Sequence, residues 1–128
     1  MYEFAMPFRL TAARELGSLL GALSHPQRLL IVEELRLGER DVASLTSALQ
    51  VAQPIISQHL NRLRLLHLVK ERREGRQVFY QLCDPHLAEW LDAGLEIILQ
   101  EARRAQEVAD ASMKARIAWS TAATGTEV

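Results

Sequence analysis

Hydrophobic positions recur with a helical period along most of the chain, and proline or glycine residues interrupt the pattern. A first helix is predicted over 10–23, and a second begins at Pro26 with Ser24 as its cap. The second helix is almost wholly apolar over 29–35, which predicts a buried central position, and Gly38 closes it. A short third helix is predicted over 42–49, capped by Asp41.

The fourth predicted helix starts near Gln53-Pro54 and runs to about residue 66, with proline tolerated in its first turn. Ile56, Leu60 and Leu63 form its apolar stripe, and the opposite side is polar. No acidic residue occurs between Gln53 and Lys70. Amides and hydroxyls both donate and accept hydrogen bonds, so this face suits the edges of nucleic-acid bases.

A β-hairpin is predicted after that helix, because 68–70 and 78–80 are β-prone and Gly75 can supply the positive φ of a tight turn. Arg72, Arg73 and Arg76 surround the turn. Charge on an exposed edge strand can simply prevent aggregation, but three arginines beside a polar-faced helix favour contact with phosphates.

The last predicted helix starts at Asp84-Pro85 and carries an apolar stripe for more than twenty residues. A domain of this size cannot cover so long a stripe, which predicts a homodimer that also uses the first helix. The interface is predicted to contain aliphatic and small side chains: Leu16, Leu19, Leu87, Leu91, Leu95, Ile98, Ala102 and Ala105. Residues 1–119 are therefore interpreted as one domain, and 120–128 as a disordered tail.

Composition narrows the classes of protein further. The chain has 128 residues, one cysteine and a net charge of −1. A single cysteine excludes an intrachain disulfide, and no apolar run is long enough to span a membrane. We expect a cytoplasmic protein that does not contact a membrane. No nucleophile, paired-carboxylate or cofactor motif occurs, so the sequence predicts no enzyme.

The charge is distributed unevenly. Residues 51–80 carry six cations and two acids, a net of +4, whereas 84–110 carry seven acids and two cations, a net of −5. The near-zero total is thus a cancellation, and the basic stretch is a candidate footprint for a phosphate backbone.

The order of these elements is that of a winged helix-turn-helix, mainly α with a small hairpin wing. The segments 23–31, 42–45, 56–63 and 73–82, above all Ser-x-His-Leu-x-x-Leu at 57–63, resemble the ArsR/SmtB family of bacterial repressors. The resemblance covers about residues 14–100 and implies a homodimer that binds a two-fold-related DNA operator until a signal releases it. Two traits depart from the family: Ala52 replaces a capping Ser, and Gln50 a turn Gly.

The candidate DNA contacts lie on the fourth helix and the wing. His59 flanks the apolar stripe, so a packing or hydrogen-bonding role with at most one phosphate contact is preferred for it. The full set is Gln53, Ser57, Gln58, His59, Asn61, Arg62, Lys70, Arg72, Arg73 and Arg76. A winged-helix module that binds another protein is the alternative function.

The resemblance also implies possible sensor sites. A thiolate metal site is excluded, because Asp41 and Ala43 occupy its positions. Asp84 and His86 match half of a zinc site, but Ile97 and Gln100 stand where the other half belongs, so helix capping is preferred and no cofactor is expected. Zinc or another divalent metal stays an alternative, as does thiol sensing by Cys83, for which a buried apolar role is preferred.

Overall fold

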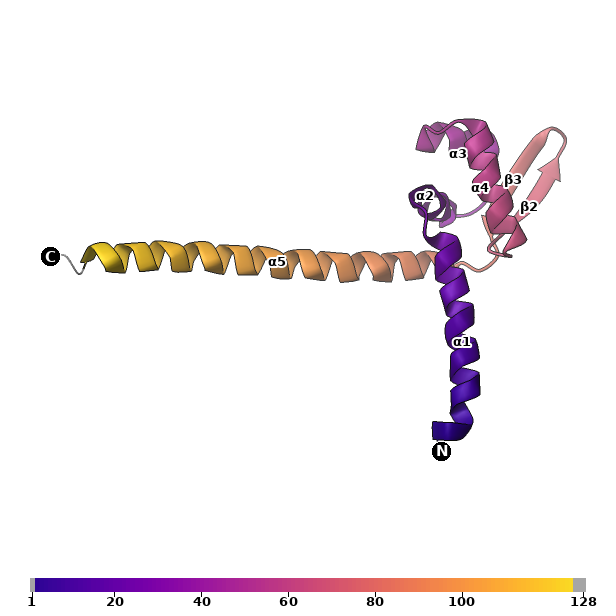
Figure 1. Cartoon of the computed structure of the whole chain (residues 1–128). Helices are drawn as coiled ribbons and strands as arrows, with labels where there is room; N and C mark the ends of the chain where they lie inside the picture. The colour runs from indigo at the N-terminus through magenta and orange to yellow at the C-terminus, as the bar shows by residue number, and fades with distance from the viewer. Residues whose placement is uncertain (1, 126–128) are drawn as a thin grey trace. The chain divides into compact units, whose positions relative to one another are not determined.

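The computed structural model describes residues 2–125, and side-chain environments for 5–122. The chain divides into two compact units, one reaching Leu91 and one starting at Asp92, and each is considered by itself. The elements, labelled in Figure 1, are α1 (Tyr2–Leu23), α2 (Pro26–Leu35), β1 (Arg40–Asp41), α3 (Val42–Leu49), α4 (Gln53–Leu65), β2 (Val69–Glu74), β3 (Gln77–Leu82) and α5 (His86–Gly125).

The first two helices differ from the sequence prediction at their ends. α1 starts at Tyr2 rather than at residue 10, and it contains Pro7. The cap of α2 is His25, whose Nδ1 accepts a hydrogen bond from the backbone N–H of Gln27 at 3.1 Å. Ser24 was predicted to be this cap, but its hydroxyl instead bonds the carbonyl of Gly21 at the end of α1.

The predicted ends of α3 and α4 agree closely with the structure. Asp41 caps α3, because its carboxylate accepts from the backbone N–H of Ser44. α4 starts after Ala52, which makes no side-chain cap, as the missing serine implies. It ends with His67 at φ 60, where N–H groups of His67 and Leu68 return to the carbonyls of Arg64 and Leu63. This is a Schellman arrangement without its usual glycine.

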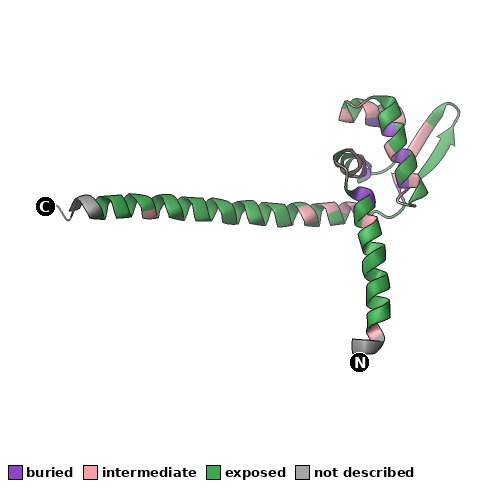
Figure 2. Cartoon of the chain, in the orientation of Figure 1, coloured by how far each residue is buried: buried purple, intermediate pink, exposed green. Residues whose placement is uncertain are grey.

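The core lies where α2, α3, α4 and the hairpin meet (Figure 2). Ile56, Leu60 and Leu63 of α4 are fully buried, as their spacing predicts. They pack with aliphatic side chains of the neighbouring elements, which include Leu23, Ile31, Val32, Leu35, Leu45, Val69, Leu82 and Leu87. Burial of one whole stripe therefore decides which face of α4 remains exposed.

The hairpin is joined to a short strand that sequence periodicity did not predict. Within residues 2–125 the strands form one antiparallel sheet in the order β1-β3-β2, with Arg40 opposite Tyr80 and Arg72 opposite Phe79. Glu74 pairs with Gln77, so Gly75 and Arg76 form a two-residue turn. Gly75 has φ 60 at the first turn position, which fits the predicted tight hairpin.

α5 is longer than the sequence predicts. It continues to Gly125, so residues 120–125 are helical where a disordered tail was predicted, and 126–128 lie outside the described residues. Asp84 does cap it, since its carboxylate accepts from the backbone N–H of His86 at 2.9 Å. The division at Leu91 also corrects the interpretation of 1–119 as one unit. No helix within 2–125 is long and apolar enough to cross a membrane.

Truncation of the buried α4 stripe tests this arrangement. Leu60→Ala should lower the free energy of unfolding by about 2 to 5 kcal/mol, because it removes packed methyl groups and leaves a cavity. Leu65→Ala, at a 59% exposed position of the same helix, should change it by about 0.5 kcal/mol or less. Denaturant titrations at equal protein concentration provide the comparison. Equal losses for the two variants would contradict the assigned orientation of α4.

Candidate nucleic-acid interface

The exposed face of α4 carries the side chains that the sequence assigns to DNA. Gln53, Ser57, Gln58, Asn61 and Arg62 are all exposed, on the side away from the buried stripe. Most of them are neutral donors or acceptors, and they project from a helix whose other face is fixed by the core. Such a rigid surface of amides and hydroxyls can read base edges.

The start of α4 and the wing tip border one hollow. A cavity of about 420 Å³ is lined by Gln53 and Ser57 of α4 and by Arg73 and Arg76 of the wing. The N-terminal end of α3 and Val78 and Tyr80 of β3 complete the lining. Four of the predicted site residues, separated by up to 23 positions in sequence, thus converge on one concave surface.

Strand alternation divides the wing cations between two faces. Successive side chains of a strand point to opposite sides of the sheet. Arg73, which pairs with Val78, lies on the cavity side, whereas Arg72 is opposite Phe79 on the other side. Lys70 shares the parity of Arg72, and both line a separate hollow with Glu39. The sequence analysis had all of these cations facing one phosphate backbone.

Arg72 is already paired within the protein. Its Nη2 and Nε donate to the two carboxylate oxygens of Glu39 at 2.6 and 3.1 Å, and its Nη1 donates to Glu74 at 2.7 Å. The guanidinium also lies over the Phe79 ring, 4.5 Å from its centroid. The interpretation of Arg72 as a free phosphate contact is therefore corrected.

His59 faces inward and joins α4 to α2. Its Nδ1 accepts from Arg28 Nε at 3.3 Å, and its Nε2 lies 3.0 Å from Gln27 Oε1. The acceptor role of Nδ1 places the proton on Nε2, so the ring is neutral. The His25 ring lies 4.4 Å away, centroid to centroid. Both nitrogens are occupied, which supports the packing interpretation and removes His59 from the set of DNA contacts.

Burial lowers the pKa of His59 below its ordinary value, and the nearby positive charges of His25 and Arg28 lower it further. Arg28 is held in place by a second bond, from Nη1 to the carbonyl of Ala22. Protonation of His59 would replace an acceptor by a donor that faces a guanidinium. The network is thus stable only with a neutral ring.

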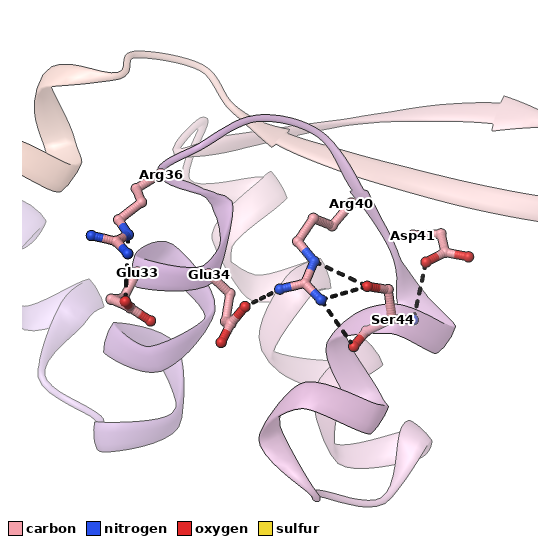
Figure 3. Close-up of polar contacts among 6 residues, drawn as sticks. All are labelled: Glu33, Glu34, Arg36, Arg40, Asp41 and Ser44. Carbon is pink, nitrogen blue, oxygen red and sulfur yellow. Dashed lines mark hydrogen bonds and ion pairs between the residues drawn. The ribbon is translucent and has the colours of Figure 1, made fainter.

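Two arginines that the sequence analysis did not select also shape the interface. Arg64 Nη2 donates to Asn61 Oδ1 at 2.7 Å, so the amide of Asn61 is oriented with its donor free. Their i, i+3 spacing in a helix could have indicated this pair. Arg40 donates to the Ser44 hydroxyl through Nε at 3.0 Å and Nη2 at 2.6 Å, and it also forms an ion pair with Glu34 (Figure 3).

Arg40 therefore joins the end of α2 to the start of α3. Glu33 and Arg36 form a separate, exposed ion pair on α2 at 3.4 Å (Figure 3). Nothing local in the sequence marks Arg40, because Glu34 and Ser44 approach it only after α2, β1 and α3 have packed. It orients α3, which lies beside the cavity.

Comparison with known proteins agrees with this geometry. Residues 25–71 match the family model "Bacterial regulatory protein, arsR family". The biofilm growth-associated repressor of Agrobacterium fabrum is 37% identical over 91 residues, which cover 71% of this chain and 78% of that protein. The chain belongs to the ArsR/SmtB family. The predicted winged helix-turn-helix fold is confirmed.

Further members of the ArsR/SmtB family share the fold. The crystal structure of the repressor BigR from Xylella fastidiosa has a TM-score of 0.63 and 34% identity, over 75% of this chain and 95% of that one. The domain Mb0332 of Mycobacterium bovis, described as homodimeric, has a TM-score of 0.60 and 26% identity over 73% and 86% of the two chains. The repressor SmtB of Mycobacterium tuberculosis is 49% identical over 72 residues, 56% of this chain but only 53% of its own length.

The zinc site implied by the ArsR/SmtB resemblance does not fit these residues. His86 Nδ1 and Asp84 Oδ1 lie 2.7 Å apart and are exposed, and the same carboxylate oxygen caps α5. The positions for the complementary ligands hold Ile97 and Gln100. Two protein ligands do not complete a tetrahedral site. Within the described part of the chain, no group of at least three His, Cys, Asp or Glu residues could hold a metal ion.

Cys83 is exposed, which corrects the preference for a buried thiol. It lines a hollow of about 250 Å³ together with Leu19, His67, Leu68, Leu87 and Trp90. Thiol sensing by Cys83 stays a prediction.

The predicted dimer residues of this ArsR/SmtB chain fall into two groups. Leu87 is 8% exposed and belongs to the core, while Leu19 and Leu91 pack partly against it. Leu87 is therefore a core residue, which corrects its assignment to the interface. The remaining residues are exposed: Leu16, Leu95, Ile98, Ala102 and Ala105. Phe8, Leu20, Ile97 and Trp119 are further exposed apolar side chains on α1 and α5.

The His59 network predicts a pH dependence of stability. Because its folded-state pKa is lowered, the unfolded chain binds more protons below about pH 6.5, and the free energy of unfolding falls as the pH drops through this window. His59→Gln should reduce that decline, as measured by thermal unfolding between about pH 8 and pH 5.

His86→Gln is the matched control with the opposite sign. The carboxylate of Asp84 raises the pKa of His86, so this pair stabilises the fold below about pH 6.5 and loses its effect as the pH rises. Its removal should steepen the decline toward acid. A His59→Gln variant that keeps the full acid decline of the parent would contradict the assignment.

Proposed function

We propose that this chain is a homodimeric, DNA-binding transcriptional repressor. The observation that carries the proposal is the cavity where Gln53 and Ser57 of α4 meet Arg73 and Arg76 of the wing. Neutral hydrogen-bonding groups on one wall and guanidinium groups on the other match a base edge beside a phosphate backbone. Bacterial DNA lies in the cytoplasm, where such a repressor acts.

In the proposed complex, α4 lies in the major groove. Gln53, Ser57 and Gln58 face the bases near the start of the helix, where recognition helices commonly make base contacts. The amide donor of Asn61, oriented by Arg64, faces a base acceptor or an adjacent phosphate. Arg62 is exposed, and no ion pair engages it among residues 2–125.

The wing tip holds the phosphate backbone. Arg76 lies in the turn and forms no ion pair within the described chain. Arg73 has a 72% exposed side chain and only a long contact of 3.7 Å with Glu71, which a phosphate can replace at little cost. The wing thus adds affinity without adding sequence preference.

A second copy covers the exposed apolar residues of α1 and α5. Large side chains such as Phe8, Leu16, Leu20, Leu95 and Ile98 are between 48% and 77% exposed, which is more than a soluble monomer normally leaves uncovered along two helices. A two-fold pair would place two copies of α4 about 34 Å apart, one turn of DNA. The homodimeric description of Mb0332 supports this assembly.

Neutralising the wing tip tests the phosphate role. Arg73→Gln combined with Arg76→Gln should weaken binding to all duplexes and reduce the slope of log K against log salt by about 2, roughly one for each lost contact. Fluorescence anisotropy over a salt series measures it, on a site selected from a random duplex pool. Lys70→Gln removes a charge from the opposite face of the wing and should leave the slope nearly unchanged.

Asn61→Ala should act on sequence preference instead. We expect a loss of about 1 to 3 kcal/mol on the selected site, concentrated at one base position, and little change on random DNA. Competition with single-substituted duplexes provides the measurement. A protein that binds no duplex from the random pool would refute the proposed function and favour a winged-helix module that binds protein.

The dimer is tested at the middle of the exposed stripe. Ile98→Asp should dissociate the dimer, because it places a charge where an apolar contact is proposed. Gln100→Asp adds the same charge on a different side of α5 and should leave the dimer intact. Sedimentation equilibrium distinguishes them, and dissociation of both variants or of neither would contradict the assigned interface.

A further inference from the structure

Arg72 joins all the strands of the sheet on the side away from α4. It leaves β2, its guanidinium lies 4.5 Å from the ring centroid of Phe79 on β3, and it ends on Glu39, the residue that precedes β1. The Arg72 and Phe79 positions are direct cross-strand partners. The contact therefore runs across the sheet, from the outer strand of the wing to the loop that leads out of α2.

The geometry of this contact is restrictive. Two nitrogens of Arg72 engage both carboxylate oxygens of Glu39, at 2.6 and 3.1 Å, which is the bidentate arrangement that a guanidinium forms and an ammonium cannot. A third nitrogen holds Glu74, the last residue of β2 before the turn. The hydrogen bond from Arg72 lowers the pKa of Glu39, so the carboxylate stays charged.

The local charge also opposes a direct role of Arg72 in DNA binding. One guanidinium is surrounded by two carboxylates, which leaves a net negative charge on this face of the wing. Arg73, the next residue, lies on the opposite face and lines the cavity with Gln53 and Ser57. A phosphate that contacts the cavity is therefore on the wrong side of the sheet for Arg72.

We infer that Glu39 and Arg72 are positioning residues, which hold the wing at the angle that brings Arg73 and Arg76 to the DNA backbone. This inference rests on the proposed DNA-binding function and assigns it two residues that do not touch DNA. The turn lies beyond the short strand β1, which pairs with β3 only at Tyr80 and Phe79. The tip therefore depends on side-chain contacts such as this one for its direction.

Glu39→Gln distinguishes a positioning role from a phosphate contact by the sign of its effect. If Arg72 bound phosphate, loss of Glu39 would release it and tighten binding. If the pair positions the wing, DNA binding should weaken by about two- to fivefold, the population bias that an exposed ion pair can impose. Glu33→Gln removes the same charge from the exposed Glu33–Arg36 pair on α2 and corrects for the change in net charge.

Two further variants separate positioning from a general loss of stability. Arg72→Lys keeps the positive charge but loses the bidentate contact, so it should weaken binding as much as Arg72→Gln does. In an Arg73→Gln, Arg76→Gln background, Glu39→Gln should have no further effect on affinity, because the wing has no cation left to position. Anisotropy titrations of folded protein, verified by circular dichroism, measure both.

The outcomes separate the inference from the function on which it rests. Weaker binding by Glu39→Gln than by Glu33→Gln, abolished in the double-arginine background, supports the positioning role. Binding by Glu39→Gln that is equal to or tighter than that of Glu33→Gln overturns it, as does an Arg72→Lys variant with the affinity of the parent. If the parent protein binds no duplex DNA, the proposed function itself fails, and the positioning role fails with it.

Discussion

The burial of one apolar stripe on α4 is the constraint on which the interface depends. Ile56, Leu60 and Leu63 are fully buried against α2, α3 and the hairpin. A helix is rigid about its own axis, so the burial of these three side chains determines where Ser57, Gln58 and Asn61 point. Affinity for a groove requires such a fixed surface, because every side chain left free to move would have to be ordered on binding.

Arginine residues of this protein serve two physically distinct purposes. Arg28, Arg40 and Arg72 each join elements that are distant in sequence, through His59, through Glu34 with Ser44, and through Glu39. Arg73 and Arg76 instead line the cavity beside α4. The planar guanidinium suits both purposes, since its fork binds a carboxylate or a phosphate with the same geometry. Only the presence or absence of an internal carboxylate tells the two apart.

Much of the fold follows from local sequence. The periods of apolar residues predict α3, α4 and the hairpin nearly to the residue, because burial of a stripe and the φ of Gly75 are local requirements. Capping was predicted correctly at Asp41 and Asp84, whose side chains need only their own helix. It failed at Ser24, because His25 reaches the same N–H group while its ring packs against His59. The strand β1 was missed because two residues carry no period.

The sequence by itself determined the winged helix-turn-helix, the polar face of α4 and the concentration of positive charge over residues 51–80, since all of these depend on spacing and composition. Only the tertiary structure decided which charges are available. Adjacent residues of a strand face opposite sides of the sheet, so Arg73 lines the cavity while Arg72 meets Glu39, a residue 33 positions away. That partner enters the picture only when β1 pairs with β3, which no local pattern can indicate.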